Sequence, residues 1–398
     1  MTSWGTAASS RGILHFHHLD PAQRSRLFIS PPEASLLDAG TDLLATALGA
    51  TLYIPADRDD LAGTVIRRAG EGICSMVLDL EDAVDETSAE VAMENAVSAL
   101  NELAAGGHAD TAMVFVRIRT AQCIERIVDK LTDGSKALAG FVIPKFNAET
   151  GEVHVRQTEE ASAALGKRLY CMPVLESVRI LYRETRDEEL SSIARILADH
   201  RETILAVRVG ATDLCGALGI RRDRDHTIYD VKVVADVIAD IVNRLGRIDG
   251  TGFVVTAPVW EYFADRERLF RPLLRTTPFA EHAAVRFRDL LVSRDLDGLL
   301  REISLDRANG LLGKTVIHPN HVAAVHALSV VTHEEYRDAC DVAVSTAGGV
   351  KRSQYRNKMN EPRPHRIWAE QVLRRAKVFG VANEGVTFVD FLTALGSQ

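Results

Sequence analysis

The sequence is poor in cysteine, and its cysteines are spaced without a motif. Cys74, Cys123, Cys171, Cys215 and Cys340 include no CxxC pair, and their number is odd. This spacing provides neither a zinc or redox motif nor a fully paired disulfide framework. We therefore interpret the cysteines as small buried hydrophobic residues rather than as catalytic groups.

Long hydrophobic runs and an excess of positive charge are also missing. No stretch of eighteen apolar residues occurs, and residues 1–20 lack a basic region followed by an apolar one. These absences argue against a membrane span and a secretory signal, so we expect a soluble cytoplasmic protein. The net charge of −8 argues against a general nucleic-acid or membrane-surface binder.

Signatures of several enzyme classes are absent as well. No GxGxxG or GxxxxGK[ST] follows an apolar run, and neither HExxH nor GxSxG occurs. The sequence therefore gives no motif support for a nucleotide-binding site, a zinc protease or a serine hydrolase. A Schiff-base mechanism would need a lysine in the site. Lys145 is the only candidate, and Pro144 before it favours a rigid strand end over a mobile nucleophile.

The sequence does contain eight short apolar runs separated by helical patterns. The runs are nearly continuous in apolar residues, which is typical of parallel strands buried on both faces. They lie at 51–56, 75–81, 112–118, 140–145, 168–176, 204–211, 252–259 and 314–319. This alternation predicts an α/β fold, the (β/α)8 TIM barrel. An open doubly wound sheet is the alternative, although no nucleotide motif supports it.

The predicted barrel spans residues 51–330 and includes a helical excursion at 260–313. Residues 1–50 would form an N-terminal extension packed on the barrel. Residues 331–398 would form a C-terminal helical segment that serves as a lid or an oligomer contact. Within this segment, the loop at 348–366 is rich in glycine, proline and charge, which is typical of a linker or lid.

Polar side chains gather where the predicted strands end, which is where α/β barrels carry their active sites. Successive strands end on Asp57 and Arg58; Asp79, Glu81 and Asp82; Arg117 and Arg119; Lys145; Glu176; Asp213; Pro258; and His318. Carboxylates crowded into one barrel mouth repel each other unless they are protonated or neutralised. A hard divalent cation with oxygen ligands is the simplest neutraliser, and we expect Mg²⁺.

Several of these motifs together resemble a known family. "TLYIPADRDDL", "MVLDLEDAV", "VFVRI", "GFVIPK", "PVLES", "VGATDLCGALG" and "GKTVIHPNHV" are similar to segments of the HpcH/HpaI aldolase and citrate lyase β-subunit superfamily. The likeness covers about residues 51–380 and favours the citrate lyase β-like, malyl-CoA lyase-like branch. It implies a TIM barrel that forms or cleaves a C–C bond with Mg²⁺ through an enolate.

The resemblance also implies roles for particular residues. Glu176 and Asp213 would be the metal ligands, and Arg117 would bind the developing oxyanion. Glu81 and Asp82 would hydrogen-bond the waters around the metal. Further candidates are Glu361 in "NKMNEP", as an acidic group donated by a neighbouring subunit, and Arg58 and Pro258, as substrate contacts at strand ends.

The chain also departs from the family pattern. The positions of a family arginine before the first strand read Gly49-Ala50-Thr51, and basic positions on the helix after "DLEDAV" read Ala89 and Met93. Basic groups there would contact the phosphates of coenzyme A. We therefore predict a 2-oxo or 3-hydroxy acid substrate and regard a CoA thioester as the less favoured choice.

Several alternatives stay open at this point. The protein could be a thioester hydrolase on the same scaffold, or a non-catalytic barrel used for assembly. A homo-oligomer (dimer, trimer or hexamer) is expected. Asp79 could cap the next helix or face the barrel interior, and a structural salt bridge to Glu81 is the alternative role of Arg117. His15, His17 and His18 are expected at the surface, and the alternating charges of 221–225 are typical of a solvated loop.

Overall fold

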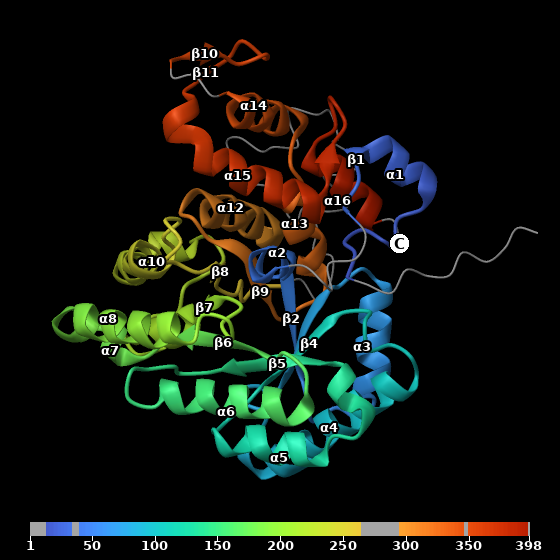
Figure 1. Ribbon diagram of the computed structural model, residues 1–398, viewed down its shortest axis with the longest axis vertical. Coiled ribbons are helices and arrows are strands. Elements are labelled where there is room, and N and C mark those ends of the chain that lie inside the picture. Colours follow the sequence, from blue (N-terminus) through green and yellow to red (C-terminus); the bar gives the residue numbers. More distant parts are fainter. Residues whose placement is uncertain (1–12, 34–39, 264–293, 346–348, 397–398) are drawn as a thin grey trace, which may run out of the picture.

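Eight parallel strands close into a barrel in chain order, from β2 to β9, and β9 pairs with β2 to complete the circle (Figure 1). The computed structural model describes residues 13–33, 40–263, 294–345 and 349–396. The barrel strands are β2 Ala50–Pro55, β3 Ser75–Asp79, β4 Met113–Arg117, β5 Leu138–Ile143, β6 Tyr170–Leu175, β7 Val207–Val209, β8 Val255–Ala257 and β9 Leu312–Val316. Each overlaps one predicted apolar run, and the TIM barrel is confirmed.

Helices follow the strands along the chain and cover the outer wall of the barrel (Figure 1). They are α3 Leu61–Gly70, α4 Ala89–Ala105, α5 Gln122–Lys130, α6 Gly151–Leu165, α7 Val178–Leu181, α8 Arg183–Asp199, α9 Ala211–Gly216, α10 Lys232–Leu245, α12 Arg294–Ala308 and α13 Asn320–Ser329. The helix α12 falls in the predicted excursion at 260–313. Residues 264–293 of that excursion lie outside the described part of the chain.

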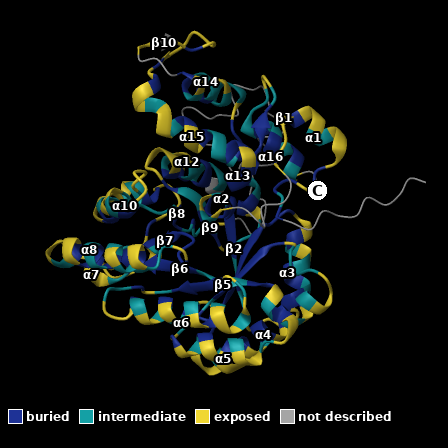
Figure 2. Ribbon diagram, viewed as in Figure 1, coloured by how far each residue is buried: buried dark blue, intermediate teal, exposed yellow. Residues whose placement is uncertain are grey.

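The continuous apolar runs form strands that are largely buried on both faces, as in β3. All five residues of β3 are buried, and so are the first four of β4. Leu52 and Leu78 belong to a cluster that includes residues of the surrounding helices, whereas Val77, Phe115 and Met172 belong to a second cluster. Figure 2 shows the resulting pattern of buried strands inside helices whose outer faces are exposed.

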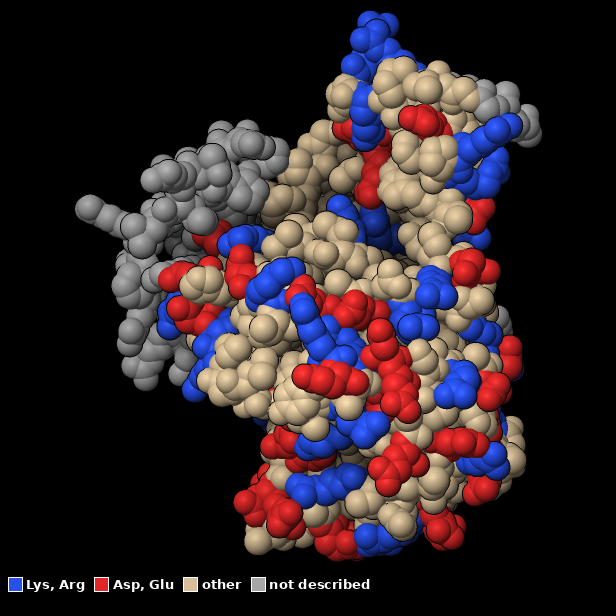
Figure 3. Space-filling model, turned by 90° about the vertical axis from the view of Figure 1, so that its left-hand side faces the viewer, with Lys and Arg blue, Asp and Glu red and all other residues tan. Residues whose placement is uncertain are grey.

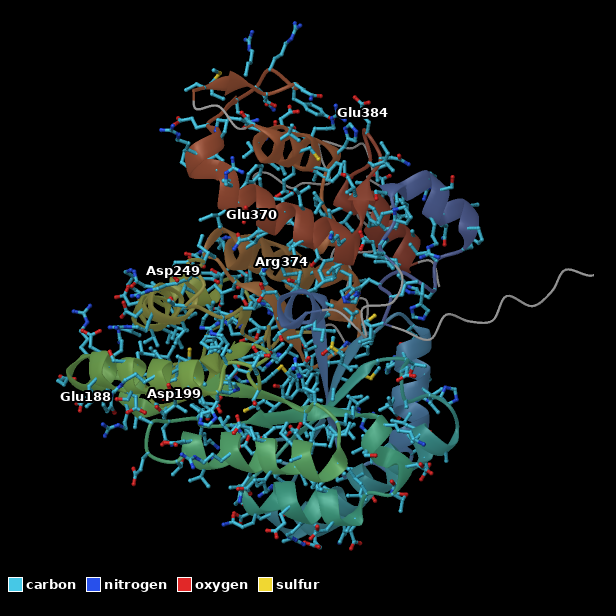
Figure 4. The ribbon with its side chains drawn as sticks, in the orientation of Figure 1. Glu188, Asp199, Asp249, Glu370, Arg374 and Glu384 are labelled. Carbon is cyan, nitrogen blue, oxygen red and sulfur yellow. The ribbon has the colours of Figure 1, made fainter. Side chains whose placement is uncertain are left out.

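The N-terminal and C-terminal segments meet beside the barrel. The strand β1 Phe28–Ser30 pairs antiparallel with β12 Val381–Ala382. The remaining elements are α1 Pro21–Leu27, α2 Thr41–Ala47, α14 His333–Val344, β10 Lys351–Arg352, β11 Met359–Asn360, α15 Pro362–Phe379 and α16 Phe388–Gly396. The helix α15 contacts α2 through Arg374 and Asp42, whose side chains lie 3.1 Å apart (Figure 4 labels Arg374). The β10–β11 hairpin lies at the end of the molecule remote from the barrel strands (Figure 1).

The expectation that all three N-terminal histidines lie at the surface was wrong. His17 is exposed, but His15 is fully buried, and its ring centroid lies 4.7 Å from that of His326 and 4.4 Å from that of Phe379. His15 also hydrogen-bonds the carbonyl of Ala47 over 2.9 Å. The histidine that looked like part of a polar cluster is therefore part of the packing between the N-terminal segment and α13 and α15.

The molecular surface carries charges of both signs. Figure 3 shows lysine and arginine interspersed with aspartate and glutamate over the face that it presents. Among the described residues, no helix is both long enough and apolar enough to cross a bilayer.

Candidate active site at the barrel mouth

The predicted site residues on β3 and β4 are brought together by strand register. Asp79 is the last residue of β3 and pairs with Arg117, the last residue of β4. Arg117 donates from Nε and Nη2 to the two carboxylate oxygens of Asp79, each over 2.6 Å. This bidentate geometry fixes the plane of the guanidinium and is the strong form of the arginine–carboxylate pair. Asp79 therefore faces the barrel interior.

Glu81 and Asp82 complete a charged network around Arg117. The Nη1 atom of Arg117 lies 3.0 Å from Glu81 and 3.2 Å from Asp82. Lys145 Nζ lies 2.5 Å from Glu81 and 3.6 Å from Asp82. Arg119 donates to the carbonyls of Leu80 and Val84 and so anchors the backbone on both sides of this acidic pair.

The two acids of this pair have pKa values displaced in opposite directions. Burial, and then the hydrogen bond with Asp82, raise the pKa of Glu81. Burial also raises the pKa of Asp82, but the hydrogen bond from Glu81 and the charges of Arg117 and Lys145 outweigh it and lower the value. Both acids also contact the cations of Arg117 and Lys145, so neither acid titrates independently of the other.

Glu176 directly follows β6 and is nearly buried, with 6 % of its surface exposed. Its Oε1 accepts a hydrogen bond of 2.8 Å from the backbone N–H of Lys145, which adopts a φ of +50°. Gly210, which follows β7, leaves room for the other oxygen, because a Cβ there would come within 1.8 Å of Glu176 Oε2. Glycine at 210 is thus required by the position of Glu176.

The environment of Glu176 favours its protonated form. Burial raises its pKa to about 8, and the nearby charges of Asp213 and Glu81 act in the same direction. The Lys145 N–H and Arg117 act in the opposite direction but are weaker. Asp213, in the first turn of α9, is therefore close enough to Glu176 for the two carboxylates to repel each other.

The carboxylates at the mouth differ in whether a cation already neutralises them. Asp79, Glu81 and Asp82 all form ion pairs with Arg117, whereas no ion pair within 4.0 Å involves Glu176 or Asp213 among the residues that the structure describes. The described part of the chain contains no group of three or more His, Cys, Asp or Glu that could hold a metal. Two protein carboxylates suit Mg²⁺, which completes its octahedron with waters and substrate. The donor set therefore fits this ion.

Other predicted site residues do not join this cluster. Arg58 is exposed, and its backbone carbonyl accepts a hydrogen bond from Asn95. Pro258 follows β8 and is buried. Glu361 is exposed at the start of α15, beside the β10–β11 hairpin. That hairpin lies far from β3, β4 and β6 in Figure 1, so Glu361 does not reach the mouth of its own barrel.

The expectation of a solvated loop at 221–225 was wrong for one residue. Arg222 is buried, pairs with the fully buried Glu302 of α12, donates to the carbonyl of Val259 and lies over the ring of Trp260. Its neighbours in the loop are exposed as expected. Arg222 thus joins the loop after β7 to the segment after β8 and to α12.

Pattern reasoning missed two residues inside the barrel. Tyr53 on β2 and Arg208 on β7 both direct their side chains inward, and the Arg208 guanidinium lies 5.5 Å from the centroid of the Tyr53 ring. The signal that could have identified Arg208 is a lone arginine inside the apolar run "AVRVGA". Such a charge on a strand with two buried faces must point into the barrel or into the helical layer.

The barrel and its carboxylate-rich mouth define an enzyme of the TIM-barrel class. Residues 42–381 match the model of a family described as C–C bond lyase of the TIM-barrel fold, and the chain belongs to this family. It is therefore a carbon–carbon lyase, as the resemblance to citrate lyase β-subunits implied.

Solved structures share the fold. A citrate lyase from Burkholderia xenovorans is 17 % identical with a TM-score of 0.59, and the match covers 87 % of this chain and 96 % of that one. The protein CitE from Mycobacterium tuberculosis, in complex with magnesium, acetoacetate and coenzyme A, is 20 % identical with a TM-score of 0.52, covering 83 % and 99 %. No curated protein matches.

Proposed function

We propose that the protein is a Mg²⁺-dependent carbon–carbon lyase that acts on a 2-oxo or 3-hydroxy acid through an enolate. One observation carries the proposal. Glu176 and Asp213 are adjacent carboxylates without an ion-pair partner among the described residues, and they lie beside an arginine whose position is fixed by Asp79. A bound Mg²⁺ would supply Lewis-acid polarisation of the substrate carbonyl.

Arg117 would bind the oxygen on which negative charge develops. Asp79 accepts one hydrogen bond from Nε and one from Nη2 of Arg117, and Nη1 forms ion pairs with Glu81 and Asp82. Because a guanidinium has five N–H groups, one N–H of Nη2 is left for the substrate. A donor held in place before the reaction stabilises the charge without reorganisation. Glu81 and Asp82 would hold the waters that complete the metal's coordination.

Glu361 would act on the site of a neighbouring subunit, which makes the active protein a homo-oligomer. Support comes from its exposed position near the remote hairpin, away from its own barrel mouth. Its carboxylate would handle the proton of the substrate hydroxyl group. Mixed oligomers of Glu361→Ala and Arg117→Ala subunits should regain activity that neither variant has alone. Failure to regain it would argue against a site shared between subunits.

The decisive test is solvent exchange. Candidate oxo acids such as pyruvate, incubated with the protein and Mg²⁺ in deuterated water, should gain deuterium at the carbon next to the carbonyl group, which in pyruvate is the methyl carbon. Glu176→Ala and Asp213→Ala should abolish the exchange while keeping the wild-type melting transition. Glu188→Ala, on the outer surface of α8 (Figure 4), is the matched control and should retain it. Wild-type exchange rates in either ligand variant would remove the metal assignment.

The choice between a free acid and a thioester can be tested separately. Met93, at one of the positions where the family pattern has a basic residue, is buried in α4 and cannot contact a phosphate. We therefore expect titration calorimetry with acetyl-CoA to show no binding at micromolar concentration. Micromolar binding would establish a thioester site instead.

A further inference from the structure

Tyr53 lies inside the barrel with two guanidinium groups over its ring. The Cζ atom of Arg117 is 5.2 Å from the ring centroid, and that of Arg208 is 5.5 Å from it. Arg117 belongs to the mouth, where it is paired with Asp79. Tyr53 thus connects the reactive end of the barrel to a second arginine deeper inside.

Arg208 is a buried cation with no anionic partner. It is 1 % exposed, and no carboxylate lies within 4.0 Å of it among the described residues. Its hydrogen bonds go to the hydroxyls of Thr51 (3.4 Å) and Thr315 (2.5 Å), and its Nε has no partner. A buried charge without a counter-charge costs several kcal/mol, so a purely structural role explains this residue poorly.

The Tyr53 hydroxyl makes no hydrogen bond with any residue that the structure describes, and the side chain is half-buried. Burial raises the pKa of Tyr53, and the charges of Asp79 and Glu176 add to this, while those of Arg208 and Arg117 oppose it. The phenol is therefore protonated at neutral pH, and it lies within the electrostatic reach of the proposed metal ligand Glu176.

We propose that Tyr53 is the catalytic acid that protonates the α-carbon of the enolate, and that Arg208 is the positioning residue that stabilises its phenolate. The inference rests on the proposed function. In the step, the Tyr53 O–H bond breaks and a C–H bond forms at the α-carbon. The negative charge passes from the enolate to the phenolate, which two guanidinium groups stabilise across the ring. Water then returns a proton to the phenolate, and the hydroxide that remains is neutralised by the proton that Glu361 took from the substrate hydroxyl.

This assignment supplies the second of the two proton transfers that the cleavage reaction needs. Cleavage of a C–C bond next to a hydroxyl needs one group that accepts the hydroxyl proton and another that gives a proton to the carbon. Glu361 of a neighbouring subunit would serve the first need from outside the barrel. Tyr53 serves the second from inside the barrel, on the same chain as Arg117, Glu176 and Asp213.

The test compares Tyr53→Phe with the matched control Tyr182→Phe, whose tyrosine is 49 % exposed on the surface. Deuterium entry into the methyl group of pyruvate is measured with Mg²⁺. This runs the proposed step in reverse, with the Tyr53 phenolate as the base that removes the methyl proton. Mg²⁺ affinity is measured by calorimetry. Loss of a positioned general acid should lower exchange by roughly a hundredfold or more in Tyr53→Phe, with Mg²⁺ affinity unchanged. Exchange within threefold of wild type would overturn the role of Tyr53. No exchange in the wild-type protein would instead overturn the proposed function, and this inference with it.

A double-mutant cycle tests the role of Arg208. Arg208→Met should reduce exchange strongly in the wild-type background but cause no further loss in Tyr53→Phe, because the two residues act in one step. Arg208→Lys, which keeps the charge, should recover part of the rate. Equal losses from Arg208→Met in both backgrounds would reduce Arg208 to a packing residue and overturn this half of the proposal.

Discussion

Binding of Mg²⁺ should release a proton at neutral pH, because Glu176 is mostly protonated in the metal-free protein. Burial, with the charges of Asp213 and Glu81, raises its pKa to about 8. At pH 7, roughly nine molecules in ten then hold the proton, whereas a metal ligand must be ionised. The apparent affinity should therefore rise about tenfold from pH 6 to pH 7, equivalent to about 1.4 kcal/mol, and become constant above pH 8.

The proton can be counted by titration calorimetry in two buffers of different ionisation enthalpy. At pH 7 the wild-type protein should release close to one proton per Mg²⁺, and at pH 9 almost none. Glu176→Gln has no proton to release and should bind Mg²⁺ weakly at every pH. Glu188→Gln, on the exposed face of α8 and outside the site, is the control and should behave as wild type. A wild-type affinity that is independent of pH, without proton release, would refute the reasoning.

Three further predictions concern stability. The pKa of Glu176 is raised on folding, so its contribution to stability is present below about pH 4.5 and lost as the pH rises towards 8. The melting temperature of the metal-free wild type should therefore fall relative to Glu176→Gln between pH 6.5 and 8.5. Burial lowers the pKa of His15 to about 4, so its contribution is present above pH 6.5 and lost as the pH falls towards 4. His15→Phe should flatten the acid limb of the melting profile. Lys314→Met leaves Asp306 buried without its cation and Glu302 with Arg222 alone, and should cost about 3–5 kcal/mol in urea unfolding.

The barrel was predictable because its signal is local and repeated. The strands are short, mainly apolar runs that are largely buried, and eight such runs alternate with helices. The convergence of polar residues at the mouth follows from the same topology, because parallel strands all end on one side. Arg117 and Asp79 therefore meet through register alone.

Residues whose partners are distant in sequence were not predictable in this way. Alternating charges at 221–225 indicate a solvated loop, yet Arg222 pairs with Glu302, eighty residues further along the chain. The local pattern around His15 contains no sign of His326. Asp79 shows a mixture of both effects, since it pairs with Arg117 across strands and also accepts a local hydrogen bond from the N–H of Glu81 over 3.0 Å.

Lys314 and Arg208 are both buried cations, but only Lys314 has ion-pair partners among the described residues. Lys314 on β9 is as buried as Arg208, but its Nζ lies 2.9 Å from Glu302 and 2.8 Å from Asp306. A lysine between the barrel wall and α12 thus has two counter-charges. The only side chains that hydrogen-bond Arg208 within the described residues carry neutral hydroxyl or thioether groups. The Arg208 guanidinium instead lies over the ring of Tyr53, 5.5 Å from its centroid, where a cation and a π-system attract each other.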